Sequence, residues 1–291
     1  MKRIFFTVFA AVALLLPAGD IFAATKIPAP VLKKGAIIPA ESSFTASSIL
    51  VLDAKSGAVL YEKSPNLVWP TASITKLMTS VIFMEQKPNM AEVVALTDAD
   101  EVGGGRLRVE TGTTLTKKDL LYCALVGSAN NTATAMMNNS GLTPKAFIKE
   151  MNIRAKTLGM NKTTYVDASG IEVGNTTTAT DIATLAKYAF ANPTIQRAAQ
   201  TASYRFSTIK PVIDKTIKNT NALLLDPNND LWILDGKTGY LEEARNNLVV
   251  RVQTMQKTHE LIVVVLGAST KQTSFSETER LTKWAWKNYA W

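Results

Sequence analysis

The chain has 291 residues, of which 46% are hydrophobic and 19% are charged, and its formal net charge is +8 at pH 7. This composition is that of a globular chain with enough apolar residues for one large domain or two small ones, and it excludes disorder for most of the sequence. One cysteine excludes an intrachain disulfide, and one histidine argues against a zinc site with several histidines. No basic run with interleaved aromatic residues indicates nucleic-acid binding.

The N-terminus has the composition of an export signal. The basic start MKR precedes an apolar stretch from Ile4 to Leu16, and small residues surround a cleavage site after Ala23. Because that stretch is short for a membrane-spanning helix, we expect residues 1–23 to be a cleaved signal peptide rather than a retained anchor. Residues 24–46 are rich in Pro, Ala and Ser and are expected to form a linker. The protein is therefore expected in the periplasmic or extracellular cell-wall space.

The folded part is expected at residues 47–291, with strands at both of its ends. Two apolar runs joined by a turn with Ser56 and Gly57 predict a hairpin near its start. Three more strand-like runs and a final helix from about Glu277 to Tyr289 occupy its end, and apolar residues at helical spacing fill the middle. The expected strands cover 49–53, 58–62, 231–240, 246–255 and 260–269, and the central helices cover 73–86, 117–139, 144–159 and 179–192.

Strands from the two chain ends are expected to pair in one antiparallel sheet with helices packed on it. The fold class is therefore α/β of the α+β kind, with an all-helical lobe of about residues 97–205 inserted. Catalytic sites often lie in the cleft between two such lobes. In the last helix, Leu281, Trp284 and Ala285 have core-facing spacing, which favours packing on the sheet. We therefore expect no peripheral membrane contact.

Ser73 and Lys76 lie three residues apart at the start of a predicted helix. This spacing puts both side chains on one face, where the Lys76 amine could take the proton of the Ser73 hydroxyl. The amine must be neutral to do so, which requires burial or a second positive charge nearby. Ser-x-x-Lys recurs at Ser207 and Lys210, but Pro211 disfavours helical geometry there. Only the first pair has the context of a nucleophile and its base.

Two further motifs follow in chain order. Ser128 and Asn130 form a Ser-x-Asn motif at a predicted helix-loop boundary, and Lys237, Thr238 and Gly239 head a predicted strand. Each motif alone is common: a polar helix start, a cap-like loop and a turn before a strand. Together, in this order and on these elements, SITK, SAN and KTG match the three-part signature of penicillin-binding proteins and class A β-lactamases.

From about Ser48 to Gly267 the chain resembles the low-molecular-mass penicillin-binding proteins, which are serine D-alanyl-D-alanine carboxypeptidases and their endopeptidase relatives. The resemblance extends to LVLDAKSGAVLYEK, FIKEMNIRAKTLGMNKTTYVDASGI, NTNALL and VVVLGA. It implies the serine β-lactamase/DD-peptidase fold, in agreement with the pattern of strands and helices. It also implies cleavage of D-Ala bonds in peptidoglycan stem peptides, covalent inhibition by β-lactam antibiotics, and no need for a metal or other cofactor.

The resemblance implies a role for each residue of the first two motifs. Ser73 would attack the D-Ala carbonyl and form an acyl-enzyme, with Lys76 as its base. Ser128 would relay a proton between the lysine and the leaving amine. Asn130 would orient Lys76 and hold the substrate amide.

The third motif and the residue after it would bind the substrate. By the same resemblance, Lys237 supplies the second cation and binds the terminal carboxylate together with Thr238. Gly239 lets an extended peptide lie against the strand. The backbone N–H groups of Ser73 and Tyr240 would form the oxyanion hole.

The chain departs from the family pattern near the second and third motifs. Asn131 stands where the family commonly has Asp, so the charge at that position is lost. Arg245 and Asn246 follow Ala244, where the family often has Gly, so the edge of the cleft is expected to differ. None of these changes touches a residue of the three motifs.

Three readings of the function stay open. The first is a D,D-peptidase, either a carboxypeptidase or an endopeptidase, and the sequence does not separate these two activities. The second is a β-lactamase, which in class A uses a deacylating Glu in a Glu-x-x-x-Asn context. Only Glu150 and Glu172 lie between Asn130 and Lys237, and neither has Asn four residues later. The third is a non-catalytic covalent penicillin sensor or peptidoglycan-binding module, against which the complete set of motif side chains argues.

Overall fold

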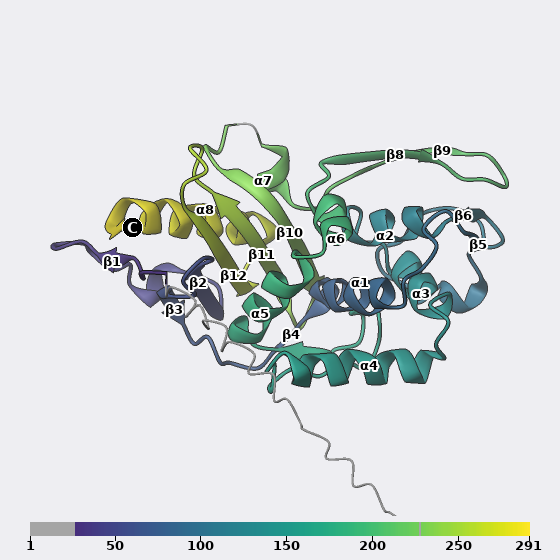
Figure 1. The fold of residues 1–291 in the computed structure, drawn as a ribbon, viewed down its shortest axis with the longest axis horizontal. Helices are drawn as coiled ribbons and strands as arrows, with labels where there is room; N and C mark the ends of the chain where they lie inside the picture. Colours follow the sequence, from purple (N-terminus) through teal and green to yellow (C-terminus); the bar gives the residue numbers. More distant parts are fainter. Residues whose placement is uncertain (1–26, 227) are drawn as a thin grey trace, which may run out of the picture.

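The computed structural model describes residues 27–226 and 228–291, so the signal peptide expected at residues 1–23 lies outside the described residues. Figure 1 shows the central sheet towards one end of the molecule and a group of helices towards the other. The strands of the sheet are β2 (Ser48–Asp53), β3 (Val59–Lys63), β10 (Trp232–Leu241), β11 (Arg245–Gln253) and β12 (Glu260–Ala268). The longer helices are α1 (Thr75–Glu85), α2 (Lys117–Leu125), α3 (Asn130–Asn138), α4 (Pro144–Thr157), α5 (Ala179–Ala189), α6 (Pro193–Ala199) and α8 (Lys271–Asn288).

The central sheet combines strands from both ends of the chain, and this prediction is confirmed. Its order is β10-β11-β12-β2-β3, and every neighbouring pair is antiparallel. The two chain ends meet where β12 pairs with β2, with Val263 opposite Val51. The strands are rich in β-branched residues, which fit a pleated surface buried on both faces. The strand that carries the Lys-Thr-Gly motif, β10, lies at an edge of the sheet.

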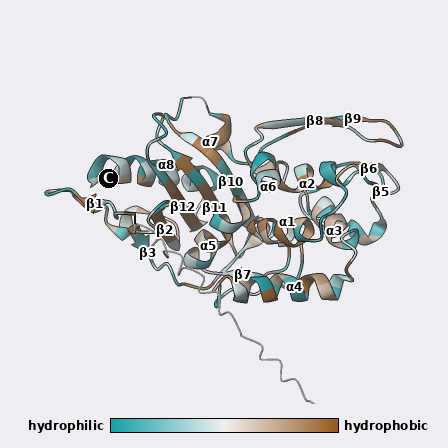
Figure 2. Cartoon of the chain, viewed as in Figure 1, coloured by the Kyte–Doolittle hydropathy of each residue, from teal (hydrophilic) through white to brown (hydrophobic). Residues whose placement is uncertain are grey.

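Side chains on the two faces of the sheet belong to two separate hydrophobic clusters. Val51 and Val263 face α8, while Leu50 and Val264 face α5 and continue into the helical lobe. Hydrophobic colours in Figure 2 concentrate on the central strands and on α1. Every residue from Thr75 to Phe83 in α1 is buried, which is typical of a helix enclosed by protein on all sides. The helix that follows Ser73 therefore lies in the interior, where its position is fixed by packing.

The helix predicted over 117–139 is divided into α2 and α3. Ser128 has a φ of +58°, a left-handed conformation that a right-handed helix does not contain. The N–H of Asn130 donates to the carbonyl of Gly105 at 2.7 Å instead of continuing α2. The break puts Ser128 in the connection between the two helices, at the helix-loop boundary that the sequence predicts.

Short strand pairs complete the helical lobe. A hairpin of β8 (Ser203–Ser207) and β9 (Asp214–Lys218) runs along the lobe towards β5 (Val93–Ala95) and β6 (Thr114–Thr116), as Figure 1 shows. The backbone of Thr114 bonds to Ile209 and Lys210 near the hairpin tip. The remaining elements are β4 (Trp69–Pro70), β7 (Thr176–Thr177), α7 (Ala222–Leu225) and the 3-10 turns η1 (Glu41–Ser43), η2 (Ala72–Ile74) and η3 (Asp98–Asp100).

The last helix begins earlier than predicted, at Lys271 instead of about Glu277. Thr270 caps it, because its hydroxyl accepts a hydrogen bond from the N–H of Thr273 at 3.0 Å. Leu281 and Ala285 are fully buried against the sheet, which confirms the predicted core-facing spacing.

Beyond this helix, β13 (Tyr289–Ala290) pairs with β1 (Val31–Leu32), which lies in the segment expected as a linker. Within residues 27–226 and 228–291, no helix combines the length and the apolarity needed to span a bilayer.

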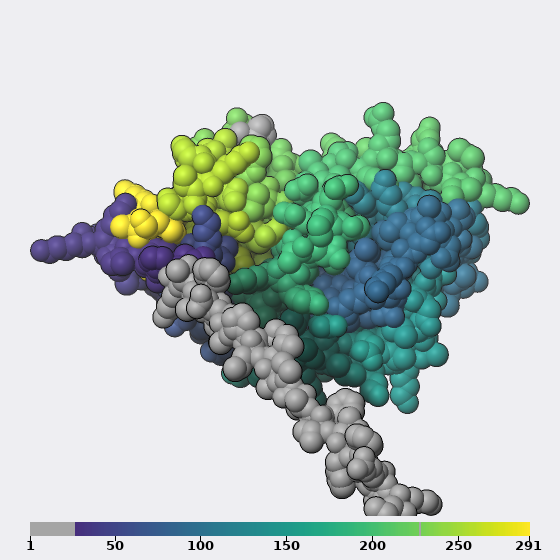
Figure 3. Space-filling view, in the orientation of Figure 1, coloured from purple at the N-terminus to yellow at the C-terminus, as the bar shows by residue number. Residues whose placement is uncertain are grey.

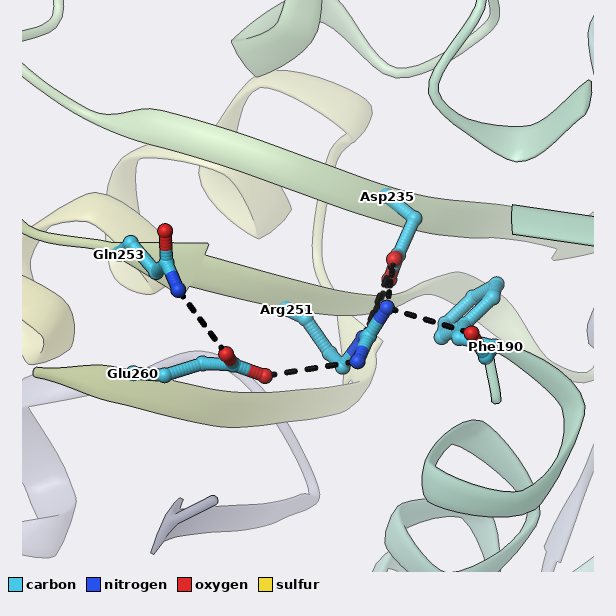
Figure 4. Close-up of polar contacts among 5 residues, drawn as sticks. All are labelled: Phe190, Asp235, Arg251, Gln253 and Glu260. Atoms are coloured by element: carbon cyan, nitrogen blue, oxygen red, sulfur yellow. Dashed lines mark hydrogen bonds and ion pairs between the residues drawn. The ribbon is translucent and has the colours of Figure 1, made fainter. Parts of the chain in front are cut away.

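A buried ion pair joins two strands of the sheet behind the Lys-Thr-Gly motif. Figure 4 shows Arg251 of β11 between Asp235 of β10 and Glu260 of β12. The Nε of Arg251 lies 3.0 Å from both carboxylate oxygens of Asp235, and its Nη1 lies 3.5 Å from Glu260. The guanidinium also stands over the ring of Phe190 at 5.4 Å. Burial raises the pKa of Asp235 to about 6, although Arg251 opposes this shift.

Replacing Arg251 should leave a buried carboxylate without its partner. We expect Arg251→Met to lower the free energy of unfolding by about 3–5 kcal/mol at pH 8. Because folding raises the pKa of Asp235 above its usual value, the penalty grows as pH rises through that pKa and is smaller at pH 5. Urea unfolding at both pH values measures this difference. The double variant Asp235→Asn/Arg251→Met is the control and should lose less stability at pH 8 than the single variant; an equal or larger loss would contradict the account.

Candidate active site

The predicted nucleophile and base meet at the start of α1. Ser73 lies in the 3-10 turn η2, directly before the helix, and Lys76 lies in the first turn of α1. A 3-10 turn has three residues per turn, so side chains three apart stand almost one above the other. The Nζ of Lys76 lies 2.8 Å from the Oγ of Ser73. The structure therefore brings the two residues within hydrogen-bond distance.

Lys76 has three hydrogen-bond partners and no contact with solvent. Besides Ser73, its Nζ lies 2.7 Å from the Oδ1 of Asn130 and 2.6 Å from the carbonyl oxygen of Ser169. Both of these oxygens only accept hydrogen bonds. A neutral amine has two N–H donors, and the two carbonyl oxygens use both. Its lone pair is then left for the hydroxyl of Ser73, which is the arrangement that a general base requires.

The surroundings of Lys76 favour this neutral form. Burial lowers the pKa of Lys76 well below its usual range, and the positive charge of Lys237 lowers it further. The negative charge of Asp167 acts in the opposite direction. The second cation that the sequence required near the serine-lysine pair is therefore present.

Asp167 organises the loop that supplies the third acceptor. Its Oδ1 accepts from the N–H groups of Ser169 and Gly170 at 2.6 and 2.7 Å, and its Oδ2 accepts from the N–H of Glu172 and the side-chain amide of Asn175. This network fixes the Ser169 carbonyl that faces Lys76. Asp167 belongs to none of the predicted motifs, although the stretch Asp-Ala-Ser-Gly at 167–170 is a turn signal that could have indicated its role.

Gly170 lets this loop approach the serine. A Cβ at Gly170 would lie 2.0 Å from the carbonyl oxygen of Ala72, and the residue has a φ of +82°. Ala72 itself has a φ of +48°, which is uncommon for a residue with a side chain. Such strain at the residue before Ser73 persists because the packed surroundings hold it.

Ser128 and Lys237 form the second half of the site. The Nζ of Lys237 donates to the Oγ of Ser128 at 2.8 Å and to the carbonyl of Thr238 at 3.0 Å. The hydroxyl of Thr238 lies 2.6 Å from that of Thr220, in the NTNALL stretch. Burial and the charge of Lys271 lower the pKa of Lys237 to about 7. The two helical motifs and the strand motif thus converge, and Asn130 and Lys237 link them.

The edge strand β10 lies directly beside the nucleophile. A Cβ at Gly239 would lie 2.9 Å from the carbonyl oxygen of Thr71 and 3.3 Å from the backbone nitrogen of Ser73. A larger residue there would push the strand away from Ser73. The side-chain amide of Asn247, on β11, donates to the carbonyl of Pro70 at 2.9 Å and ties the sheet to the turn before the serine.

A cleft of about 590 Å³ opens over these residues. Its lining includes Ser73, Ser128, Asn130, Thr238 and Tyr240. Lys271, at the start of α8, also lines the cleft, although none of the predicted motifs includes it. It lies 34 positions after Lys237 (271 − 237) in a segment with no motif, so only the folded chain shows that its charge acts on Lys237.

Asn131 does not line the cleft, and its side chain instead binds the segment of residues 101–107 beside it. Its Oδ1 accepts from the N–H of Leu107 at 3.0 Å, and its Nδ2 donates to the Leu107 carbonyl at 3.0 Å and to Glu101 at 2.8 Å. An aspartate could accept from the N–H but could not donate to the carbonyl. The amide at this position therefore has a structural use that a carboxylate would not have.

Comparison with known proteins agrees with this geometry. A family model described as D-alanyl-D-alanine carboxypeptidase matches residues 36–270. The chain belongs to the D-alanyl-D-alanine carboxypeptidase family. The D-alanyl-D-alanine endopeptidase of Pseudomonas aeruginosa is 34% identical over 85% of this chain and 79% of its own length. The corresponding endopeptidase of Escherichia coli is 32% identical over 88% of this chain and 83% of its own length.

Solved structures related to the D-alanyl-D-alanine carboxypeptidase family have the same fold. A variant of the Streptomyces K15 DD-transpeptidase superposes with a TM-score of 0.78 at 24% identity and covers 86% of this chain and 100% of its own. A D-alanyl-D-alanine carboxypeptidase from Mycobacterium tuberculosis gives a TM-score of 0.77 at 23% identity, over 88% of this chain and 96% of its own. The predicted DD-peptidase fold is confirmed.

Asp167 should act as a positioning residue for the base. In Asp167→Asn, the side-chain amide has one oxygen, so it can accept the hydrogen bonds of only one of the two Asp167 carboxylate oxygens. The Ser169 carbonyl should then shift, and acylation by benzylpenicillin should slow about ten-fold or more. Loss of the Asp167 charge also lowers the pKa of Lys76, so the acid limb of the pH–rate profile should move to lower pH.

Stopped-flow acylation rates across pH measure both effects, and Asp214→Asn on the exposed hairpin is the matched control, with no expected change. A slower rate without a shifted acid limb would mean that Asp167 has only a structural role.

Proposed function

We propose that this member of the family is a serine D,D-peptidase that cleaves D-Ala bonds in peptidoglycan stem peptides through an acyl-enzyme on Ser73. The proposal rests on the contacts of the Lys76 amine, which is fully buried and lies 2.8 Å from the Ser73 hydroxyl. The other two partners of this amine are carbonyl oxygens. In this arrangement the lysine has no other hydroxyl proton to accept. The reaction class is therefore acyl transfer to a serine activated by lysine.

The first half of the reaction forms the ester. The Oγ of Ser73 attacks the D-Ala carbonyl carbon while its proton moves to the Nζ of Lys76. The backbone N–H groups of Ser73 and Tyr240 stabilise the negative charge on the carbonyl oxygen. The C–N bond then breaks, and Ser128 passes the proton from Lys76 to the leaving amine. Water subsequently hydrolyses the ester and restores the Ser73 hydroxyl.

Binding of the substrate depends on the edge strand and on the cations beside it. An extended peptide adds to β10 as a further strand, next to Gly239. Lys237, Thr238 and Lys271 bind the carboxylate of the residue that leaves. Asn130 contacts the substrate amide as well as Lys76. β-Lactam antibiotics would acylate the same serine, and export to the cell wall would place the enzyme with its polymer substrate.

An intact-mass time course with benzylpenicillin tests the nucleophile. The wild-type protein should gain a penicilloyl adduct that persists, as expected of a peptidase, whereas Ser73→Ala should gain none. The Ser73→Ala variant should stay folded, with an unfolding free energy within about 1 kcal/mol of the wild-type value, because only one hydrogen bond is lost.

Ser207→Ala changes the serine of the second Ser-x-x-Lys match and should acylate as the wild type does. Its hydroxyl donates to Asp214 in the hairpin, and Ser207 does not line the cleft. A penicilloyl adduct on Ser73→Ala would disprove the nucleophile. An adduct that the wild type loses within seconds would instead support the β-lactamase reading.

A further inference from the structure

The active-site cleft continues beyond Ser128 as a groove across the helical lobe. Gly104, Gly105 and Gly127 line the cleft that contains Ser73. The same three glycines line a second hollow of about 660 Å³, which also borders Arg106, Arg108 and Glu110. A third hollow, of about 230 Å³, extends from Gly127 and Arg108 to Lys215 and Ile217 of β9. Because neighbouring hollows share lining residues, they lie next to one another from the nucleophile to the β8–β9 hairpin.

Both walls of this groove are held in place by contacts within the protein. Asn131 binds both backbone groups of Leu107 and so fixes the segment of residues 101–110 to α3. On the other side, the Nζ of Lys215 donates to the carbonyl of Arg108 at 2.9 Å. The hairpin tip is anchored on Thr114, and Figure 3 shows the hairpin in green above the blue residues of the lobe. The groove is therefore preformed.

Glycines and charged side chains both line the groove. Gly104, Gly105 and Gly127 have no side chains, so a peptide backbone can lie close to them. The charged side chains beyond the first cleft are Arg106, Arg108 and Lys215, together with Glu110. Arg106 pairs with Glu101 at 2.9 Å, whereas neither Arg108 nor Lys215 has a carboxylate within ion-pair distance in the described part of the chain. Two cations are thus available to an anionic ligand.

The position of Ser128 indicates which part of the substrate would enter the groove. In the proposed reaction, Ser128 protonates the leaving amine, and Gly127 directly precedes it at the entrance to the groove. A leaving D-Ala ends within the first cleft, where Lys237 and Lys271 meet its carboxylate. A leaving residue that carries a second peptide needs room beyond Ser128, and the groove supplies that room.

We propose that this groove binds the leaving strand of a cross-linked pair of stem peptides, with Arg108 and Lys215 contacting free carboxylates on that strand. The inference rests on the proposed function and specifies its substrate as a cross-linked peptide, so the chain acts as an endopeptidase. The relatives that are 34% and 32% identical to this chain are D-alanyl-D-alanine endopeptidases, which is consistent with this substrate.

The test compares two substrates with one double variant of the full mature chain. Arg108→Gln/Lys215→Gln should lower kcat/KM at least ten-fold for a cross-linked bis-peptide whose leaving strand has free carboxylates. For a single peptide ending in D-Ala-D-Ala, and for acylation by benzylpenicillin, the same variant should stay within two-fold of the wild type. The selective loss should also shrink at high salt, because screening weakens the wild-type contacts.

Arg205→Gln/Lys218→Gln removes two exposed charges from the same hairpin, outside the groove, and should change neither substrate's cleavage. An equal loss for both substrates, a loss confined to the single peptide, or no loss at all would overturn the groove assignment. These outcomes require a wild-type protein that penicillin acylates. Absence of acylation in the wild type would instead overturn the proposed function and this inference with it.

Discussion

The structure depends on one buried amine. Lys76 lies in a helix enclosed on all sides, and its Nζ contacts a hydroxyl and two carbonyl oxygens without access to water. Keeping a charged ammonium buried in the protein interior costs several kcal/mol of free energy. The positive charge of Lys237 nearby increases that cost. The neutral amine avoids the cost and is also the species that can accept the proton of Ser73. In the proposed reaction, the buried and neutral Lys76 therefore takes the part of the histidine in a serine-histidine pair.

This amine needs partners from distant parts of the chain, and the two-lobed fold provides them. The sheet, built from both chain ends, holds β10 and Asn247 against the turn that carries Ser73. The helical lobe supplies Asn130, and the loop ordered by Asp167 supplies the Ser169 carbonyl. None of these segments could place its group alone. The cleft lies between the lobes because its parts come from both of them.

Much of this arrangement could be predicted from the sequence, for identifiable reasons. Ser73 and Lys76 act through a local helical spacing, and the antiparallel sheet follows from periodicity at both chain ends. The Ser169 carbonyl could not be predicted as a partner of Lys76, because it is a backbone group 93 residues away in the sequence. Lys271 belongs to no sequence motif, so it could not be predicted as a cleft residue. Its position in the cleft depends on how α8 packs on the sheet. The left-handed conformation of Ser128, which divides the predicted helix, could not be predicted, because a residue with a side chain seldom adopts it.

We infer that Lys76 is neutral in the free enzyme, and a titration of its amine decides whether this is so. The 13Cε signal of Lys76 in the folded protein can be followed from pH 5 to 11 and assigned by its absence in Lys76→Arg. We predict that Lys76 titrates well below the ordinary lysine pKa of about 10.4, so that the amine is free to accept the Ser73 proton at neutral pH. A Lys76 signal that titrates at or above that ordinary value would contradict the account.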